Sequence, residues 1–370
     1  MDNRFEQRRA RLLPVLERER VDLLLVTCET NVSYLTGFTG DSTWLVTGPD
    51  RSQLISDGRY TEQLQEECPG VEARIRPTEV KLHDAAIELL KESGARRIGV
   101  EAHVMSVELH DLLTAGLSGV ELVPTSGVIE EELRSIKDEH EIAEIRHAIQ
   151  LAIQGFEELR EFATATRTER ECAFELEAAL RRAGAECLSF PAIVAVGDRA
   201  ALPHYHAGNR RMGDDPLLLV DWGAQTPAGY MSDLTRTMWR GEPTPQFERV
   251  YSIVLSAQAA AIEAIRPGLT GAEVDKIARD VIADAGYGEQ FGHSLGHGIG
   301  LDIHEQPRLA PNSKAELKAG MVVTVEPGIY LPHWGGVRIE DDVLVTAEGC
   351  EVLSTSISHR LEDMLWPQLR

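Results

Sequence analysis

A chain of 370 residues is long enough for two domains, each with its own hydrophobic core. Its hydrophobic content of 43% and charged content of 26% are typical of a globular protein in water. A net charge of −23 disfavours nucleic acid and anionic membranes as partners. No run approaches the roughly 20 apolar residues that span a bilayer.

The cysteines are scattered, odd in number and without a C-x-x-C pair, so they indicate neither a disulfide framework nor a thiolate zinc site. Free thiols fit a reducing compartment. The N-terminal stretch MDNRFEQRRARLL is charged throughout and lacks the apolar segment of a signal peptide. We therefore expect a cytoplasmic protein.

The first third of the chain alternates between strand-like and helical patterns. A helix is predicted over 4–20, and the Thr-, Ser- and Gly-rich segment 30–42 is predicted to be a loop. Strands are predicted at Asp22–Thr27, Thr43–Thr47, Gln53–Ser56, Glu72–Ile75, Arg97–Val100 and Val120–Val123, and helices at Tyr60–Glu67, Leu82–Lys91 and Ser106–Leu113. This alternation indicates an α/β domain with a largely parallel sheet.

A boundary near Pro124–Gly127 separates an expected N-terminal domain, residues 1–126, from a second domain, residues 127–370. The second domain opens with isoleucines spaced three and four apart, which is a helical pattern. Its helices are predicted at about 137–164, 169–183, 246–265 and 271–285. The strands of this domain carry turn signals typical of antiparallel pairing, so an α+β domain is expected to follow the α/β domain.

Residues 217–239, LLLVDWGAQTPAGYMSDLTRTMW, read as two apolar strands joined by a Pro-Ala-Gly turn. Each strand carries an aspartate, Asp221 or Asp233, where a half-buried sheet favours an apolar residue. A buried carboxylate is unfavourable unless it is paired or binds a metal, and two that face each other repel. A cation between them removes that repulsion. The alternative is that one aspartate lies in the turn or pairs with Arg236 or Arg240.

Three later stretches also carry ionisable residues that packing alone does not explain. The first, FGHSLGHGIGLDIHE at 291–305, holds three histidines among four glycines, and so many glycines disfavour a helix with a zincin histidine pair. These histidines are His293, His297 and His304. In the second stretch, MVVTVEPGIY at 321–330, Glu326 ends an apolar run. In the third, GGVRIEDDVLV at 335–345, Arg338 and Glu340 share a strand face. Taken singly, each is explained as a surface residue, an ion pair or a core histidine.

Taken together, four of these acids and one glycine-framed histidine form a chemical set: Asp221, Asp233, Glu326, Glu340 and His297. Four carboxylates carry a charge of −4, which two divalent ions neutralise, so two metals are expected. Carboxylates with a single imidazole suit Mn(II), Co(II) or Fe(II) at least as well as zinc, and the histidine argues against calcium. Two such ions can activate a water and polarise the bond that it attacks.

A competing motif overlaps the histidine-rich stretch. Residues 292–296 match G-x-S-x-G, the nucleophile elbow of serine hydrolases, which requires a strand before it and a helix after it. The flanking sequences DAGYGEQF and GHGIG fit neither element, and a serine mechanism does not explain the four acids. We therefore prefer the metal hypothesis.

The motifs VDWGA…GYMSDLTRT, HSLGHGIGLDIHE, TVEPGIY and GGVRIEDDV resemble those of the aminopeptidase P and prolidase (Xaa-Pro peptidase) family of pita-bread metallopeptidases. In the first domain, NVSYLTGFTG and LISDGRY resemble the creatinase-type N-terminal domain of that family, and ELRSIKDEHEIAEIRHA at 132–148 resembles its linker helix. The resemblance extends to about residue 356. It implies an α+β fold in which a pita-bread catalytic domain is preceded by a smaller α/β creatinase-type domain.

By position, the resemblance also implies metal ligands. Asp221 would bind one ion, Asp233 and Glu340 would bridge both ions, and His297 and Glu326 would complete the other. Glu326 would also help to activate the water.

Four more residues match positions around the family's reacting bond. His204, in the motif LPHYHAG, matches a histidine near the scissile bond, and His304 matches one that stabilises the tetrahedral intermediate. His293 would shape the proline pocket, and Arg338 would orient Glu340.

One spacing departs from the family pattern. Asp233 follows Asp221 by 12 positions, one more than is usual in that family. Because side chains alternate between the faces of a strand, an extra residue within a strand would turn one aspartate away. We expect the extra residue in the turn that contains Pro227 and Gly229, rather than in a bulge.

The resemblance implies a dinuclear metal-dependent peptidase that removes an N-terminal residue preceding proline, so its partners would be peptides with proline in second position. A dipeptidase restricted to Xaa-Pro dipeptides is the alternative. A creatinase-like C–N hydrolase and a non-catalytic peptide-binding relative are disfavoured because no ligand is missing, and a methionine aminopeptidase because it usually lacks the N-terminal domain. Mn(II) is the expected metal, with Co(II), Zn(II) or Fe(II) as alternatives. A homo-oligomer, dimer or tetramer, is expected because the family commonly forms one.

Overall fold

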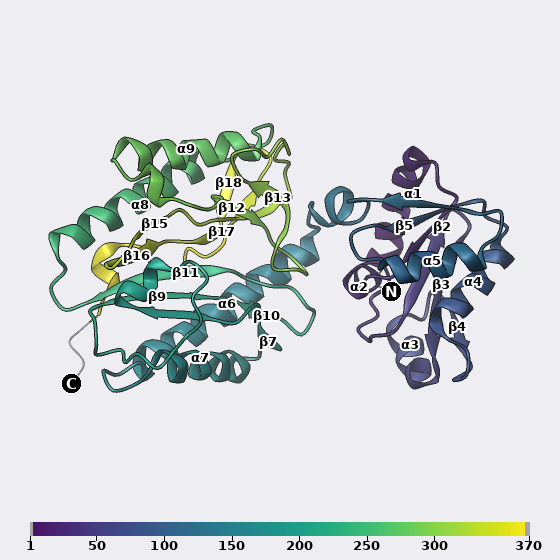
Figure 1. The fold of residues 1–370 in the computed structure, drawn as a ribbon, viewed down its shortest axis with the longest axis horizontal. Coiled ribbons are helices and arrows are strands. Elements are labelled where there is room, and N and C mark those ends of the chain that lie inside the picture. The colour runs from purple at the N-terminus through teal and green to yellow at the C-terminus, as the bar shows by residue number, and fades with distance from the viewer. Residues whose placement is uncertain (1–2, 367–370) are drawn as a thin grey trace. The chain divides into compact units, whose positions relative to one another are not determined.

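The computed structural model describes residues 3–366; the ends of the two expected domains, 1–2 and 367–370, lie outside this range. The chain divides into two compact units after Arg134, later than the boundary expected at 126 (Figure 1). None of the described helices is both long and apolar enough to cross a membrane.

The N-terminal unit is built on a six-stranded sheet of order β4-β3-β2-β1-β5-β6. The strands are β1 (Leu23–Val26), β2 (Trp44–Gly48), β3 (Arg51–Asp57), β4 (Glu72–Arg76), β5 (Arg97–Glu101) and β6 (Glu121–Thr125). The helices are α1 (Arg4–Glu19), α2 (Glu29–Thr36), α3 (Thr61–Glu67), α4 (Leu82–Ser93) and α5 (Val107–Gly116). β2 runs antiparallel to both of its neighbours and the other three pairs are parallel, so the expected alternation is confirmed with one reversed strand.

The prediction of a loop over 30–42 is wrong for its first half, because α2 occupies Glu29–Thr36. Thr36 donates its hydroxyl to the carbonyl of Val32 inside this helix, and Gly37 ends it with a left-handed φ of 86°. Apolar and aromatic residues of α2 are buried in the unit. That burial stabilises a helix whose Thr-, Ser- and Asn-rich composition has a low intrinsic preference for one.

The second unit contains four long helices and mostly antiparallel strands. The helices are α6 (Glu139–Phe162), α7 (Glu169–Ala183), α8 (Pro245–Ala264) and α9 (Gly271–Asp284). The strands are β7 (Cys187–Leu188), β8 (Ile193–Val196), β9 (Leu217–Trp222), β10 (Ala224–Gln225), β11 (Leu234–Arg240), β12 (Gly296–Gly298), β13 (Glu305–Leu309), β14 (Val322–Val325), β15 (Gly328–Leu331), β16 (Gly335–Arg338), β17 (Asp341–Val345), β18 (Cys350–Val352) and β19 (Leu365–Trp366). Figure 1 shows the strands between α6 and α7 on one side and α8 and α9 on the other. The expected α+β architecture is confirmed.

Two sheets of this unit carry the residues of interest. One has the order β19-β11-β9-β8 and the other the order β13-β12-β14-β17-β18.

Three of the four helices begin with a capping box, in which the N-cap side chain and an acid three residues later satisfy each other's backbone groups. The pairs are Asp138 with Glu141, Thr168 with Glu171 and Thr270 with Glu273.

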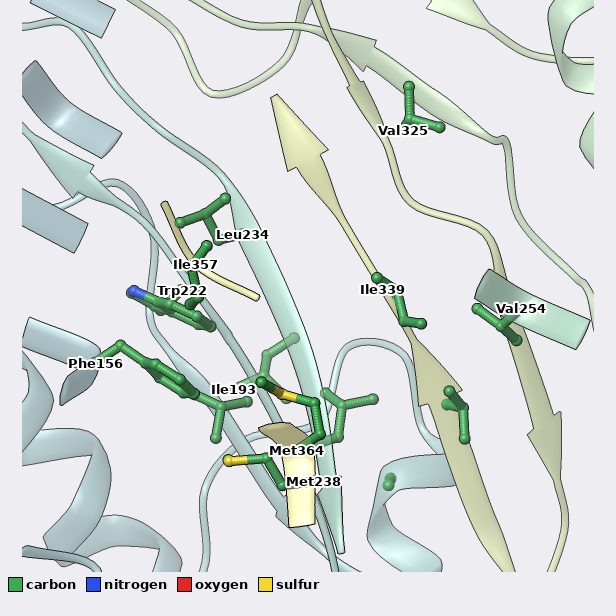
Figure 2. Packing of buried hydrophobic residues seen from close by; sticks show 14 of the residues in the cluster. Phe156, Ile193, Trp222, Leu234, Met238, Val254, Val325, Ile339, Ile357 and Met364 are labelled. Carbon is green, nitrogen blue, oxygen red and sulfur yellow. The ribbon is translucent and has the colours of Figure 1, made fainter. Parts of the chain in front are cut away.

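The back of the β9–β11 hairpin packs into the hydrophobic core. The indole of Trp222 stacks on Phe156 with ring centroids 4.2 Å apart, and its Nε1 donates to the carbonyl of Ala152, 2.8 Å away (Figure 2). Side chains alternate between the two faces of a strand. Anchoring Trp222 behind β9 therefore turns its neighbour Asp221 to the opposite face.

Candidate active site

The hairpin places both aspartates on one face. Asp221 pairs with Thr235, which lies two positions after Asp233, so all three side chains point the same way. The pairing keeps a single register up to an isolated bridge between Gln225 and Met231. No bulge interrupts this register, so the additional residue lies in the turn between Gln225 and Met231, as expected.

The other acids reach the same place from the second sheet. Glu326 directly follows β14, and Glu340 lies between β16 and β17, where it forms an isolated bridge with Thr235. His297 is the central residue of β12, which pairs with β14. The two sheets therefore meet where β9 and β14 end, because Asp221 lies next to the last residue of β9 and Glu326 follows β14.

Three of these side chains can hold one cation. Candidate ligand atoms of Asp233, His297 and Glu340 lie within 4.8 Å of one another, and all three residues are buried. The Nε2 atom of His297 lies 3.6 Å from Oδ2 of Asp233 and 3.5 Å from Oε1 of Glu326. Asp221 faces the same group across the hairpin and is also buried.

Burial and mutual repulsion dominate the electrostatics of the four acids. Burial raises the pKa of Asp233 well above its ordinary range, and Glu340, Asp221 and Glu326 raise it further. Burial also raises the pKa of Glu326 to about 8. Carboxylates in this condition hold protons unless a cation shares their charge.

The hydrogen bonds around His297 prepare it for metal binding. We assign its ring proton to Nδ1, because this atom lies 3.0 Å from the carbonyl of Gly298, so the lone pair of Nε2 faces the acids. Burial lowers the pKa of His297 to about 3, which keeps the ring neutral. The Oδ1 atoms of Asp221 and Asp233 are buried and have no hydrogen-bond partner within residues 3–366. Unpartnered carboxylate oxygens and a neutral imidazole fit divalent metal ions.

Arg338, the last residue of β16, links the β15–β16 hairpin to the β9–β11 hairpin at this site. It donates through Nη2 to Asp221, through Nε to the hydroxyl of Thr235 (3.0 Å) and through Nη1 to the hydroxyl of Tyr330 (2.8 Å). Thr235 in turn donates to Oε2 of Glu340, 2.6 Å away. Arg338 therefore contacts Asp221 directly and reaches Glu340 through Thr235, whereas the resemblance implied Glu340 alone.

Tyr330 connects this network to His293. Its hydroxyl lies 2.9 Å from Nε2 of His293, and Nδ1 of His293 donates to the carbonyl of Ser294 (2.8 Å). Burial lowers the pKa of His293 to about 4, so this ring is also neutral. Sequence reasoning missed Thr235 and Tyr330. For Thr235 the signal was present in the period-2 pattern, because Thr235 follows the candidate ligand Asp233 by two residues in the same strand-like run.

A cavity of about 440 Å³ brings together all nine residues predicted from the sequence. They are His204, Asp221, Asp233, His293, His297, His304, Glu326, Arg338 and Glu340. The rings of His297 and His304 meet edge to face with centroids 4.4 Å apart. The cavity wall also includes Phe190, Tyr205, His206 and Arg308, which sequence reasoning did not single out.

The arginines that offered an alternative explanation for the aspartates are bound elsewhere. Arg236 donates to Oδ1 of Asp341 (2.7 Å) on the buried side of the sheet. Arg240 donates to the backbone carbonyls of Met212 and Asp215. Their positive charges are therefore committed to groups other than Asp221 and Asp233.

Ser294→Ala is expected to leave peptidase activity within about threefold of wild type, because Ser294 lacks the setting of a nucleophile. The motif follows the short helix η4 (Gly288–Gln290) and leads into β12, so neither the strand nor the helix of a nucleophile elbow is present. Steady-state kinetics at full metal occupancy test this. A loss of several orders of magnitude with metal still bound would restore the serine mechanism.

Two layers of antiparallel strands and an acid-rich cavity with one neutral, inward-facing histidine define a metallohydrolase. Residues 143–347 match the model of metallopeptidase family M24, and residues 8–136 match the creatinase/prolidase N-terminal domain. The chain belongs to metallopeptidase family M24, and the resemblance to aminopeptidase P and prolidase is confirmed.

Relatives match over nearly the whole chain. An uncharacterised peptidase of Bacillus subtilis is 41% identical over 91% of this chain and 94% of its own. A structure described as an Xaa-Pro dipeptidase from Bacillus anthracis has a TM-score of 0.91 at 40% identity and covers 96% of this chain and 98% of its own. The X-Pro aminopeptidase from Thermotoga maritima has a TM-score of 0.88 at 34% identity and covers 97% and 99%.

Proposed function

We propose that this protein is a dinuclear metal-dependent Xaa-Pro aminopeptidase, which hydrolyses the bond between an N-terminal residue and a following proline. The observation that carries the proposal is the convergence of four acids and one neutral histidine on a single cavity. The names of its solved relatives, which include both Xaa-Pro dipeptidase and X-Pro aminopeptidase, support the choice of substrate.

We assign the metal ligands as expected: Asp221, Asp233, His297, Glu326 and Glu340. Two divalent ions held there would lower the pKa of a water and polarise the substrate carbonyl. The Mn(II) preference, with Co(II), Zn(II) or Fe(II) as substitutes, follows from this mixed donor set. We also propose that the protein forms a homo-oligomer, either a dimer or a tetramer. The five free cysteines support a reducing, cytoplasmic setting.

The protein's own groups would then handle protons and hold the peptide. Glu326, whose Oε1 faces the other ligands, would take the proton from the attacking water. His304 and His204 lie on the cavity wall, where an imidazole N–H can donate to the carbonyl oxygen as charge develops on it. His293 is fixed by Tyr330 and would form a rigid wall for the proline ring.

Xaa-Pro peptides are expected to be cleaved at least about tenfold faster than matched Xaa-Ala peptides, a preference of about 1.4 kcal/mol. The Xaa-Pro bond is a tertiary amide without an N–H, so a site that requires this donor cannot position it. A site that acts only on the carbonyl group can position this bond. Values of kcat/KM for paired peptides test the preference. Equal values would leave a general metalloaminopeptidase.

A second candidate, a dipeptidase, is favoured by Arg308. Its exposed side chain lies on the cavity wall and forms no hydrogen bond or ion pair with any described residue. A guanidinium in this position suits the free carboxylate of a dipeptide. Peptides of two, three and five residues, assayed with wild type and Arg308→Gln, separate the candidates. A strong dipeptide preference that Arg308→Gln removes would establish the dipeptidase.

His304→Ala is expected to lower turnover while both ions stay bound, because His304 is proposed to stabilise the transition state and not to ligate. His297→Ala is expected to lose metal, because its Nε2 faces the acids. Metal content and kcat, measured on the same preparations, test the pair. The assignment is reversed if His304→Ala loses metal while His297→Ala retains it.

A further inference from the structure

A buried carboxylate outside the metal site contacts the segment that carries His204. Glu169 is the first residue of α7 and is 0% exposed. Acids at this position of a helix usually lie in solvent, where they interact with the helix dipole. A fully buried carboxylate needs hydrogen-bond donors, so its partners indicate what it does.

Glu169 accepts three hydrogen bonds, all from residues 196–208. Its Oε1 accepts from the backbone N–H of Val196 (2.9 Å), where β8 ends. Its Oε2 accepts from the hydroxyl of Tyr205 (2.8 Å) and from the backbone N–H of Gly208 (3.0 Å). A single side chain thus holds the beginning, the middle and the end of this segment. His204 and Tyr205, both on the cavity wall, belong to it.

Gly208 leaves room for this arrangement. A Cβ atom at position 208 would lie 2.8 Å from the Tyr205 hydroxyl and 3.2 Å from Oε2 of Glu169. The backbone N–H of Arg170 also donates to the carbonyl of Gly208 (3.0 Å). The far end of the segment is therefore tied to α7 twice, through the Glu169 carboxylate and through a backbone hydrogen bond, whereas Val196 and Tyr205 are tied to it through the carboxylate.

Helix capping does not explain why Glu169 is buried at the start of α7. The capping box at the start of α7 is formed by Thr168 and Glu171, and Glu171 is exposed. Glu171 accepts from the backbone N–H and the hydroxyl of Thr168. The two acids stand two residues apart on one helix turn, and one caps the helix while the other binds the segment.

We propose that Glu169 is a positioning residue for the cavity. By holding the Tyr205 hydroxyl and the Val196 backbone, it fixes the adjacent His204 at the reacting end of the peptide. The effect on catalysis rests on the proposed peptidase function. The effect on the segment itself does not depend on that function.

Glu169→Gln tests the proposal against Glu171→Gln as the matched control on the same helix turn. The amide keeps the shape but replaces one acceptor oxygen by a donor that faces a donor. We expect Glu169→Gln to lower kcat/KM by at least about tenfold at unchanged metal content, and Glu171→Gln to stay within about twofold of wild type.

Limited trypsin digestion provides a readout without activity. Arg199 is exposed within the segment, so cleavage after Arg199 reports on release of the segment. Mass spectrometry should detect a new N-terminus at Ala200 sooner in Glu169→Gln than in the control, at matched thermal stability. If the protein proved inactive on Xaa-Pro peptides, this result would still decide the positioning role.

Tyr205→Phe keeps the proposal testable if Glu169→Gln folds poorly, because it removes only one bond to the carboxylate. Its effect on kcat/KM should have the same sign, and the double variant should be no worse than Glu169→Gln alone, since both act through one contact. Glu169→Gln that matches its control in kinetics and in cleavage after Arg199 would overturn the proposal. Strictly additive losses would also overturn it.

Discussion

Asp233→Ala and Glu340→Gln are each expected to lower kcat/KM by at least about 10³-fold, about 4 kcal/mol of transition-state stabilisation. Both residues lie in the three-residue group whose ligand atoms are within 4.8 Å of one another. As proposed bridging ligands they would act on both ions, so either change would disturb the whole centre. Metal content by elemental analysis and steady-state kinetics on Xaa-Pro peptides measure the two effects together.

The environment of Asp233 explains why its loss should be severe. Its Oδ1 is buried without a partner in the described part of the chain, and its backbone N–H donates to Oδ2 of Asp342 (3.1 Å), which holds the main chain at this position. Thr235 similarly holds Glu340 by a bond of 2.6 Å. Side chains held by such partners are preorganised, and a replacement cannot recover the geometry by changing rotamer.

Asp280→Asn is a suitable control for the substitution itself, because Asp280 is an exposed carboxylate on α9 that pairs with Lys276. It should leave activity and metal content unchanged.

A chelator should abolish wild-type activity, and Mn(II) or Co(II) should restore it. Active wild-type protein without any transition metal would contradict the metal hypothesis, as would full activity of Asp233→Ala.

The proposed metal ligands could be singled out in the sequence because their signal is local. An acid within an apolar strand is conspicuous in any single stretch, and the period of two fixes the face on which it lies. The hairpin illustrates this: the spacing of Asp221 and Asp233, together with Pro227 and Gly229 between them, predicted that the additional residue lies in the turn, and the pairing confirms it.

Residues that act through distant partners could not be predicted in this way. Glu169 is a normal first-turn acid in the sequence, and its role emerges only when Tyr205, 36 positions later, reaches its carboxylate. Arg308 is an ordinary strand residue until the fold brings it to the cavity. The helix α2 was missed for a related reason, since tertiary burial outweighed its local composition.

Glu326→Gln is expected to lower kcat by about 10² to 10⁴-fold, the range that general base catalysis contributes. The amide keeps the shape of the side chain but can neither take a proton from water nor share a ligand charge. Oε1 of Glu326 lies 3.5 Å from His297 Nε2, among the proposed metal ligands, where bound cations would keep the carboxylate ionised and able to take a proton from water. The measurement is kcat at saturating Mn(II), with metal content determined on the same sample.

Two further variants separate the two roles proposed for Glu326, that of general base and that of metal ligand. Glu326→Asp keeps the charge and the basic oxygen but withdraws them by one methylene, so it should retain more metal and more turnover than Glu326→Gln. Glu316→Gln, at an exposed position outside the cavity wall, should behave as wild type. If Glu326→Gln loses turnover only in proportion to its metal content, Glu326 serves as a ligand alone. Turnover within about threefold of wild type at full metal content would exclude both roles, because either one is worth far more in the transition state.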